Sequence, residues 1–241
     1  MPGLSAILLA TPLFGLSLTP PALDGAILPA PVEVVDVAAT LPMPELLQAD
    51  GAVPSPDAAA QAEADRQYTE DVIRRRDIGQ VHRALGIATW FAMTANLIVG
   101  MMQYSDLYGF GAGQNGNPCA TGNGIVLNEC SGDPYIHIVS ASVTSVLYGG
   151  TFLLSLVMPD PNQAAEGPGV FADHLRIHEA LRWVHVIGMA AQIVIGAMLS
   201  NGVFGDRANN YDVMQAMAAT HLAIGWATWG ALSASAAIML F

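Results

Sequence analysis

The chain has 241 residues, 53% of them apolar, and a net charge of −12 from 20 acidic residues against 8 arginines and no lysine. Its mean hydropathy of +0.44 is higher than soluble domains ordinarily reach, so the composition predicts a membrane protein. Nucleic acid is excluded as a partner, because the basic surface that it requires is missing.

The N-terminal third differs from the rest of the chain. Residues 1–20 contain an apolar run that resembles the core of a secretory signal, although no basic residue precedes it. Residues 21–77 form an acidic linker rich in Ala and Pro, for which we expect loosely held chain. The linker ends in a densely charged stretch, 65–77, which predicts a solvated helix leading into the next segment.

Four long apolar stretches follow, at 78–102, 136–158, 175 or 178 to 199, and 217–241. Each is long enough to cross a hydrocarbon core of about 30 Å as a helix. The second and fourth have no polar stripe, which a soluble helix would need. The sequence therefore predicts an all-α integral membrane four-helix bundle over residues 78–241.

An internal two-helix repeat is expected in this domain. The first and third stretches align without gaps, and the matched positions include His82 with His178. The second and fourth align more weakly, with His137 over His221. Each stretch thus begins at or near a histidine. Because consecutive short-looped spans alternate in direction, His82 and His178 are expected at one membrane face and the other two at the opposite face.

Paired imidazoles in a membrane bundle indicate a site, because polar side chains are costly there. Two neutral imidazoles that face each other match the axial ligands of a b-type haem, which needs no CxxCH motif, and this chain has none. Two haems b are therefore predicted. The expected metal ligands are His82 with His178, and His137 with His221.

Other residues are assigned to the same cofactors. Gly86 and Gly225 follow two of the histidines by one helical turn, where a small residue lets a flat macrocycle approach the backbone. Arg83 and Arg182 are placed to reach haem propionates. On the third stretch His185 is an alternative ligand to His178, about 10 Å deeper on nearly the same helix face. The repeat favours His178, because Thr89 aligns with His185.

Two cysteines, Cys119 and Cys130, share one polar loop. A disulfide is predicted, with two free thiols as the alternative, and a disulfide would place the loop outside the cytoplasm. Arginines cluster before the first and third stretches, which also puts the Cys loop outside. A cleaved signal peptide would give the opposite orientation, so the absolute topology stays open.

The placement of the four histidines over residues 78–241 resembles the cytochrome b561 family. The resemblance implies two b haems and electron transfer across a membrane, from ascorbate or a quinol-like donor to an acceptor on the other face. The chain would then be a membrane oxidoreductase or an electron-transfer subunit. The lysine expected near the family's donor site has no counterpart here, and the extra flanking helices of animal and plant members are missing.

Two other functions are kept as alternatives. One is a haem-free structural or partner-binding membrane subunit, whose histidines only cap the spans. The other is a metal-dependent membrane hydrolase with His174, His178 and His185 on one helix face. Besides the lipid bilayer, the expected partners are a small redox donor or quinol and an electron acceptor, in a homodimer or a redox complex. The expected location is the bacterial inner membrane.

Overall fold

A computed structural model describes residues 55–126, 129–131 and 133–239. The signal-like segment at 1–20 and the linker up to residue 54 lie outside the described residues. Within them, all regular secondary structure is helical. Three helices are long and apolar enough to cross a membrane: α1 (Pro56–Tyr108), α3 (Tyr135–Val157) and α4 (Val170–Ser200). The predicted all-α class is confirmed. The length and apolar composition of the three helices also agree with the predicted membrane protein.

Helix α1 begins at Pro56, earlier than the charged stretch in which we expected a helix. The hydroxyl of Ser55 accepts a hydrogen bond from the backbone N–H of Ala58 at 3.2 Å, and Pro56 occupies the first helical turn. The alanine-rich segment that follows has high helix propensity. This part of the predicted linker is therefore helix. The helix ends at Gly109, where a φ of 57° allows the N–H to donate to the carbonyl of Ser105.

The remaining elements are α2 (Pro118–Thr121), a short helix in the Cys loop, and α5 (Tyr211–Ile238). Helix α5 is not among the three helices that are long and apolar enough to cross a membrane. It contains many Ala, Gly, Ser and Thr residues, which are less apolar than Leu, Ile and Val. The fourth span therefore stays a prediction, while its helical state is shown.

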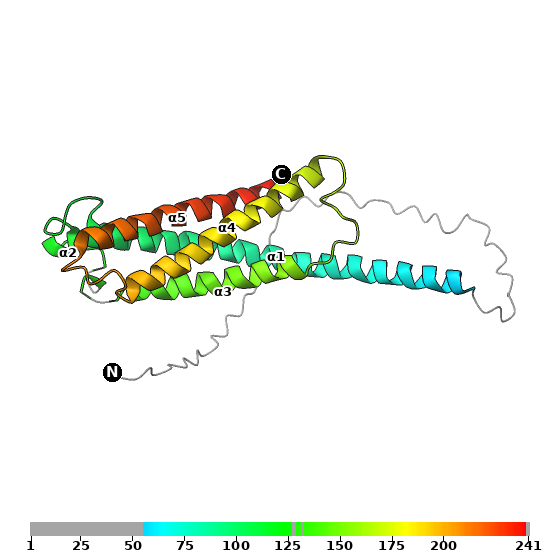
Figure 1. The fold of residues 1–241 in the computed structure, drawn as a ribbon, viewed down its shortest axis with the longest axis horizontal. Helices are drawn as coiled ribbons and strands as arrows, with labels where there is room; N and C mark the ends of the chain where they lie inside the picture. The colour runs from blue at the N-terminus through cyan, green and yellow to red at the C-terminus, as the bar shows by residue number, and fades with distance from the viewer. Residues whose placement is uncertain (1–54, 127–128, 132, 240–241) are drawn as a thin grey trace, which may run out of the picture. The chain divides into compact units, whose positions relative to one another are not determined.

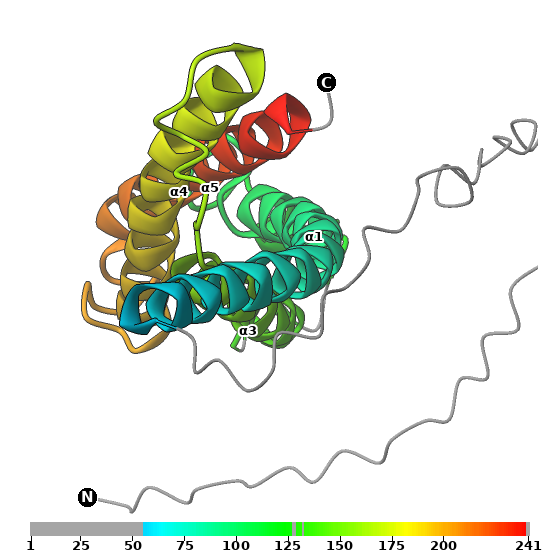
Figure 2. The ribbon, with the colours of Figure 1, turned by 90° about the vertical axis from the view of Figure 1, so that its right-hand side faces the viewer.

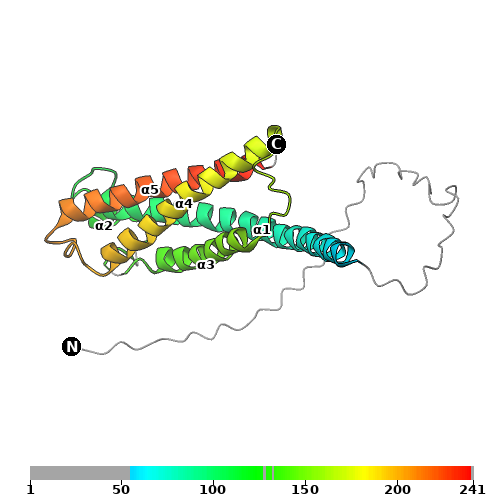
Figure 3. The same cartoon turned by 45° about the vertical axis from the view of Figure 1, so that its right-hand side comes forward.

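The four long helices run side by side (Figure 1). Helix α1 packs along α3 and along α5, and α4 packs along α5. Figures 2 and 3 show α1 between α3 and α5. The N-terminal half of α1 extends beyond the other helices, and Arg75 ties it to the α3–α4 loop through Asp160 and the carbonyl of Pro159, each at 2.7 Å. The chain thus forms two helical hairpins, α1–α3 and α4–α5.

Polar contacts join these hairpins in the middle of the helices. The indole N–H of Trp90 donates to Ser233, and that of Trp229 donates to Thr94, each at 2.9 Å. A buried apolar cluster lies beside them and consists of Met93, Tyr148 and Met189, with Phe152, Val186, Trp229 and Leu232 packed against it. Because this cluster draws on all four long helices, it holds the two hairpins in a fixed register.

Candidate functional site: two histidine pairs

The first histidine pair joins α1 to α4. The ring centroids of His82 and His178 are 6.4 Å apart, and the ring planes are 79° from each other. The Nδ1–H of His82 donates to the carbonyl of Thr151 at 3.0 Å. Nδ1 of His178 is 2.9 Å from both the carbonyl oxygen and the hydroxyl of Ser235, and since a carbonyl oxygen can only accept, we assign the proton to this Nδ1. Because Nδ1 carries the proton in both rings, each Nε2 has a free lone pair for a ligand.

The second pair joins α3 to α5. The ring centroids of His137 and His221 are 6.1 Å apart with an interplanar angle of 89°. Both Nδ1 atoms are buried, and neither has a hydrogen-bond partner among the described residues. A buried polar atom without a partner in the protein calls for a water, an ion or a ligand. Protein contacts alone therefore leave the hydrogen-bonding capacity of this pair unsatisfied.

The spacing of the rings fits one metal ion between each pair. An imidazole nitrogen binds a first-row transition metal at about 2.0 Å and lies ~1.2 Å from its ring centre, so two rings that share one ion have centres at most about 6.4 Å apart. The observed separations are 6.4 and 6.1 Å. Within the described residues, no group of three His, Cys, Asp or Glu side chains could hold a metal ion. Each pair thus offers two protein ligands.

The two pairs lie toward opposite ends of the region in which the four long helices pack together. A Cβ atom built on Gly100 would be 3.0 Å from Cε1 of His137, so the ring of His137 lies against this turn of α1. At 1.5 Å per helical residue, the run from His82 to Gly100 covers about 27 Å. The same spacing separates His178 from Gly196, where a built Cβ atom would be 3.2 Å from Cε1 of His221. The separation is close to the thickness of a hydrocarbon core, about 30 Å.

A large cavity surrounds the second pair. It has a volume of about 1020 Å³, and its lining includes His137, His221, Gly100 and Gly196. This volume lies at the upper end of the range for small-molecule and cofactor sites. The lining is mostly apolar, with the amides of Asn96, Gln103 and Gln192 among its polar groups. A flat cofactor that is mostly apolar matches such a lining.

His185 lies away from the facing rings. Its Nδ1 is 2.7 Å from the hydroxyl of Tyr148, and both side chains are buried. The structure therefore brings His178, and not His185, opposite His82 at the distance of a shared ligand. His174 lies one turn before His178 in α4 and is half-buried.

The residues predicted beside the cofactors have different surroundings. Gly225 is buried and lines the cavity of the second pair. Gly86 faces α3, since a Cβ atom there would be 3.8 Å from Cγ2 of Thr151. Arg83 is exposed. Arg182 is half-buried over the ring of Trp183 at 5.5 Å, and its Nε has no partner among the described residues.

Sequence reasoning missed the residues that contact the rings most closely. Gly100 and Gly196 are matched positions of the repeat, and retention of a glycine at both was a signal that could have identified them. The sequence does not indicate that the carbonyls of Thr151 and Ser235 accept hydrogen bonds from the rings, because every residue has a backbone carbonyl. Tyr148 left no signal either, since an aromatic residue in an apolar stretch is ordinary core.

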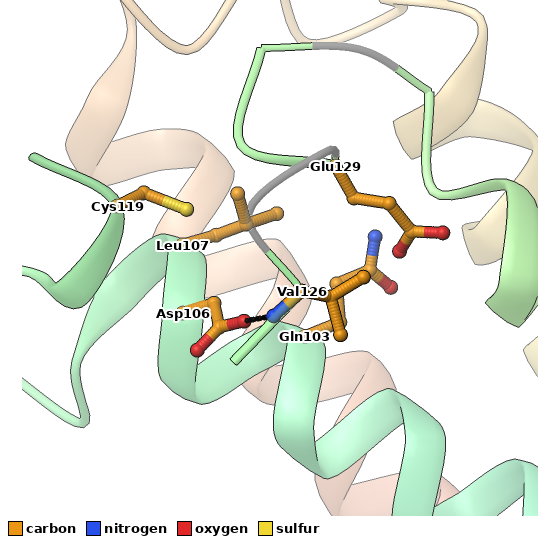
Figure 4. Close-up of a pocket in the computed structure, with 6 residues that line it drawn as sticks. All are labelled: Gln103, Asp106, Leu107, Cys119, Val126 and Glu129. Atoms are coloured by element: carbon orange, nitrogen blue, oxygen red, sulfur yellow. Dashed lines mark hydrogen bonds between the residues drawn. The ribbon is translucent and has the colours of Figure 1, made fainter. Parts of the chain in front are cut away.

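The loop between α1 and α3 closes this end of the molecule. Cys119 and Cys130 form a disulfide, as predicted, with their Cα atoms 5.4 Å apart. Figure 4 shows the carboxylate of Asp106 directed at the backbone of the loop, where it accepts hydrogen bonds from Ile125 and Val126 at 2.9 and 2.8 Å. The carboxylate of Asp106 therefore holds the loop against the end of α1, and the disulfide closes the loop on itself.

The fold and the site define a helical membrane protein with two facing histidine pairs toward opposite ends of the region in which its long helices pack together. No protein-family model, curated protein or solved structure matches the chain.

Proposed function

We propose that the chain is a di-haem b-type membrane cytochrome, similar to the cytochrome b561 family, that transfers electrons between the two faces of a membrane. The observation that carries the proposal is the pair of ring separations, 6.4 Å for His82 with His178 and 6.1 Å for His137 with His221. At these separations the two imidazoles of each pair could together hold one haem iron. A haem supplies one-electron chemistry at its iron, and the protein supplies ligands and surroundings.

The chain's own groups support this assignment at each pair. At the first pair, carbonyl acceptors fix both rings with Nδ1 protonated, which is the arrangement that orients metal-binding histidines in general. At the second pair, the cavity of about 1020 Å³ and the glycines that face the rings provide room for a macrocycle. Arg83 and Arg182 are proposed as propionate partners at the first pair.

We also propose that α1, α3, α4 and α5 form a transmembrane four-helix bundle built from an internal two-helix repeat. Matched positions of the repeat have matching surroundings. Met93 and Met189 are each 6% exposed in one cluster, and Thr144 and Thr228 are each 2% exposed. Gly100 and Gly196 each face a histidine of the second pair. Agreement at several independent positions supports descent from one duplicated hairpin.

The middle of the bundle would separate the two cofactors. The buried cluster of Met93, Tyr148 and Met189 excludes water there. Trp90 and Trp229 lie beside it with their ring centroids 6.2 Å apart. In this arrangement a donor gives up an electron at one face, an acceptor receives it at the other, and no water path accompanies it. The proposed donor is a small reductant or a quinol, and the proposed location is the bacterial inner membrane.

The spectrum of the purified protein tests the proposal. A reduced-minus-oxidised difference with a b-type α band, together with two haems per chain in a pyridine haemochrome assay, is the expected result. One haem per chain would contradict the two-site arrangement. A colourless protein, reconstituted with haemin without a spectral change, would overturn the proposal in favour of a haem-free membrane subunit.

A further inference from the structure

A single arginine lines the cavity that contains the second histidine pair. Arg207, in the α4–α5 loop, lines this cavity together with His137 and His221 and is half-buried. The other seven arginines lie within residues 66–83 and 176–182, toward the opposite end of the long helices. Because the chain has no lysine, Arg207 is the only basic side chain other than histidine among the described residues at this end of the long helices.

The disulfide-closed loop holds Arg207 in position. Its guanidinium donates a hydrogen bond to the carbonyl oxygen of Cys130. Cys130 is bonded to Cys119, and the carboxylate of Asp106 fixes the backbone between these two cysteines (Figure 4). The guanidinium is therefore held against a constrained backbone, and less conformational entropy is lost when it binds a ligand.

Arg207 has binding capacity that the protein does not use. No carboxylate in the described part of the chain lies within salt-bridge distance of it. The neighbouring Asp206 instead accepts hydrogen bonds from the side chain and backbone of Asn209, at 2.8 to 3.0 Å, and these bonds lower the pKa of Asp206. A guanidinium has five N–H donors in a planar fork that matches a carboxylate.

We propose that Arg207 is the carboxylate-binding residue of this cavity. The inference rests on the proposed function, since the cavity would hold a haem ligated by His137 and His221. The carboxylate then comes either from a propionate of that haem or from an acidic electron donor in the cavity. Both would meet the guanidinium at the same place, and they differ in what the loss of Arg207 changes.

Replacement of the guanidinium distinguishes a haem propionate from an acidic electron donor as the source of the carboxylate. In Arg207→Gln, loss of a propionate partner shifts the midpoint potential of one b component downward, because a nearby cation favours the reduced, less positive haem. Arg207→Lys keeps the positive charge and should therefore retain most of the wild-type potential. Arg176→Gln, with the same charge change at the other end of the bundle, should leave both potentials unchanged. The unshifted second component shows that each variant is folded.

The donor is tested with naphthohydroquinone with and without a ring carboxylate. If Arg207 recognises the donor, Arg207→Gln slows reduction by the carboxylate-bearing compound alone and leaves both midpoint potentials unchanged. If neither potential nor either rate changes while both b components are present, the inference is wrong and the proposed function stands. A wild-type protein that binds no haem overturns the proposed function and the inference together.

Discussion

The Nδ1–H of His82 donates to the carbonyl oxygen of Thr151 on α3, at 3.0 Å. His178 makes the equivalent bond to Ser235, whereas Nδ1 of His137 and of His221 has no partner in the described part of the chain. The two histidine pairs are thus alike in ring spacing and different in what supports the rings.

This difference predicts the order of the midpoint potentials. A hydrogen bond from Nδ1–H makes an imidazole a stronger donor, which stabilises the oxidised iron and lowers the potential. The component bound by His82 and His178 should therefore have the lower potential. Redox titration of His82→Ala and His137→Ala identifies which component each variant loses. Loss of the higher-potential component in His82→Ala would contradict the prediction.

The pairing of the histidines predicts which variants behave alike. His82→Ala and His178→Ala should lose the same b component, and His137→Ala and His221→Ala should lose the other, because low-spin ligation needs both axial imidazoles. Haem content should fall from about two per chain to about one. His185→Ala should keep both components, and His174→Ala serves as a control. Removal of a component by His185→Ala, but not by His178→Ala, would make His185 the ligand.

A larger side chain at Gly100 should disturb the second pair. A Cβ atom there would be 3.0 Å from the ring of His137, so Gly100→Val should displace the ring and remove or broaden that component, at a stability cost of about 1–3 kcal/mol. Gly79→Val is the matched control in the same helix, because nothing lies within 4 Å of a Cβ atom there. Low-temperature absorption spectra and thermal unfolding in detergent measure both effects. Equal effects of the two variants would contradict a specific contact.

The disulfide predicts a loss of stability when it is removed. Cys119→Ser with Cys130→Ser releases a short closed loop and should cost roughly 3 kcal/mol in the free energy of unfolding. Since the chain has two cysteines, mass spectrometry of non-reduced peptides identifies the cross-link without ambiguity. Alkylation of both thiols without a reductant would disprove the bond and remove the argument that the loop faces an oxidising compartment.

The buried contact between Tyr148 and His185 predicts a structural role. Tyr148→Phe leaves Nδ1 of His185 without its partner and should cost about 1–2 kcal/mol, with both b components retained. Tyr135→Phe, at an exposed position of the same helix, should cost much less. Thermal unfolding of the two variants in the same detergent compares them. Loss of a haem component in Tyr148→Phe would instead assign His185 to a cofactor site.

The sequence predicted the helices well because apolar length is a local property. It also predicted that His82 would face His178 and that His137 would face His221, since a repeat with alternating helix directions leaves few other arrangements. The start of α1 differs from the prediction because recurrent proline in the Ala/Pro-rich segment led us to expect loosely held chain, whereas proline is favoured in the first helical turn, where Pro56 lies. The hydrogen bonds and packing contacts of the rings could not be predicted. They depend on how each helix is rotated about its axis, and the sequence does not specify that rotation.

Each histidine pair takes one ring from the α1–α3 hairpin and one from the α4–α5 hairpin. Neither hairpin alone can complete a pair, and the docking of one hairpin against the other completes both at once. The two pairs therefore share a single assembly step during biogenesis. In a chain whose second hairpin has not docked, all four imidazoles remain without their partners, and polar side chains in that state are costly inside a bilayer.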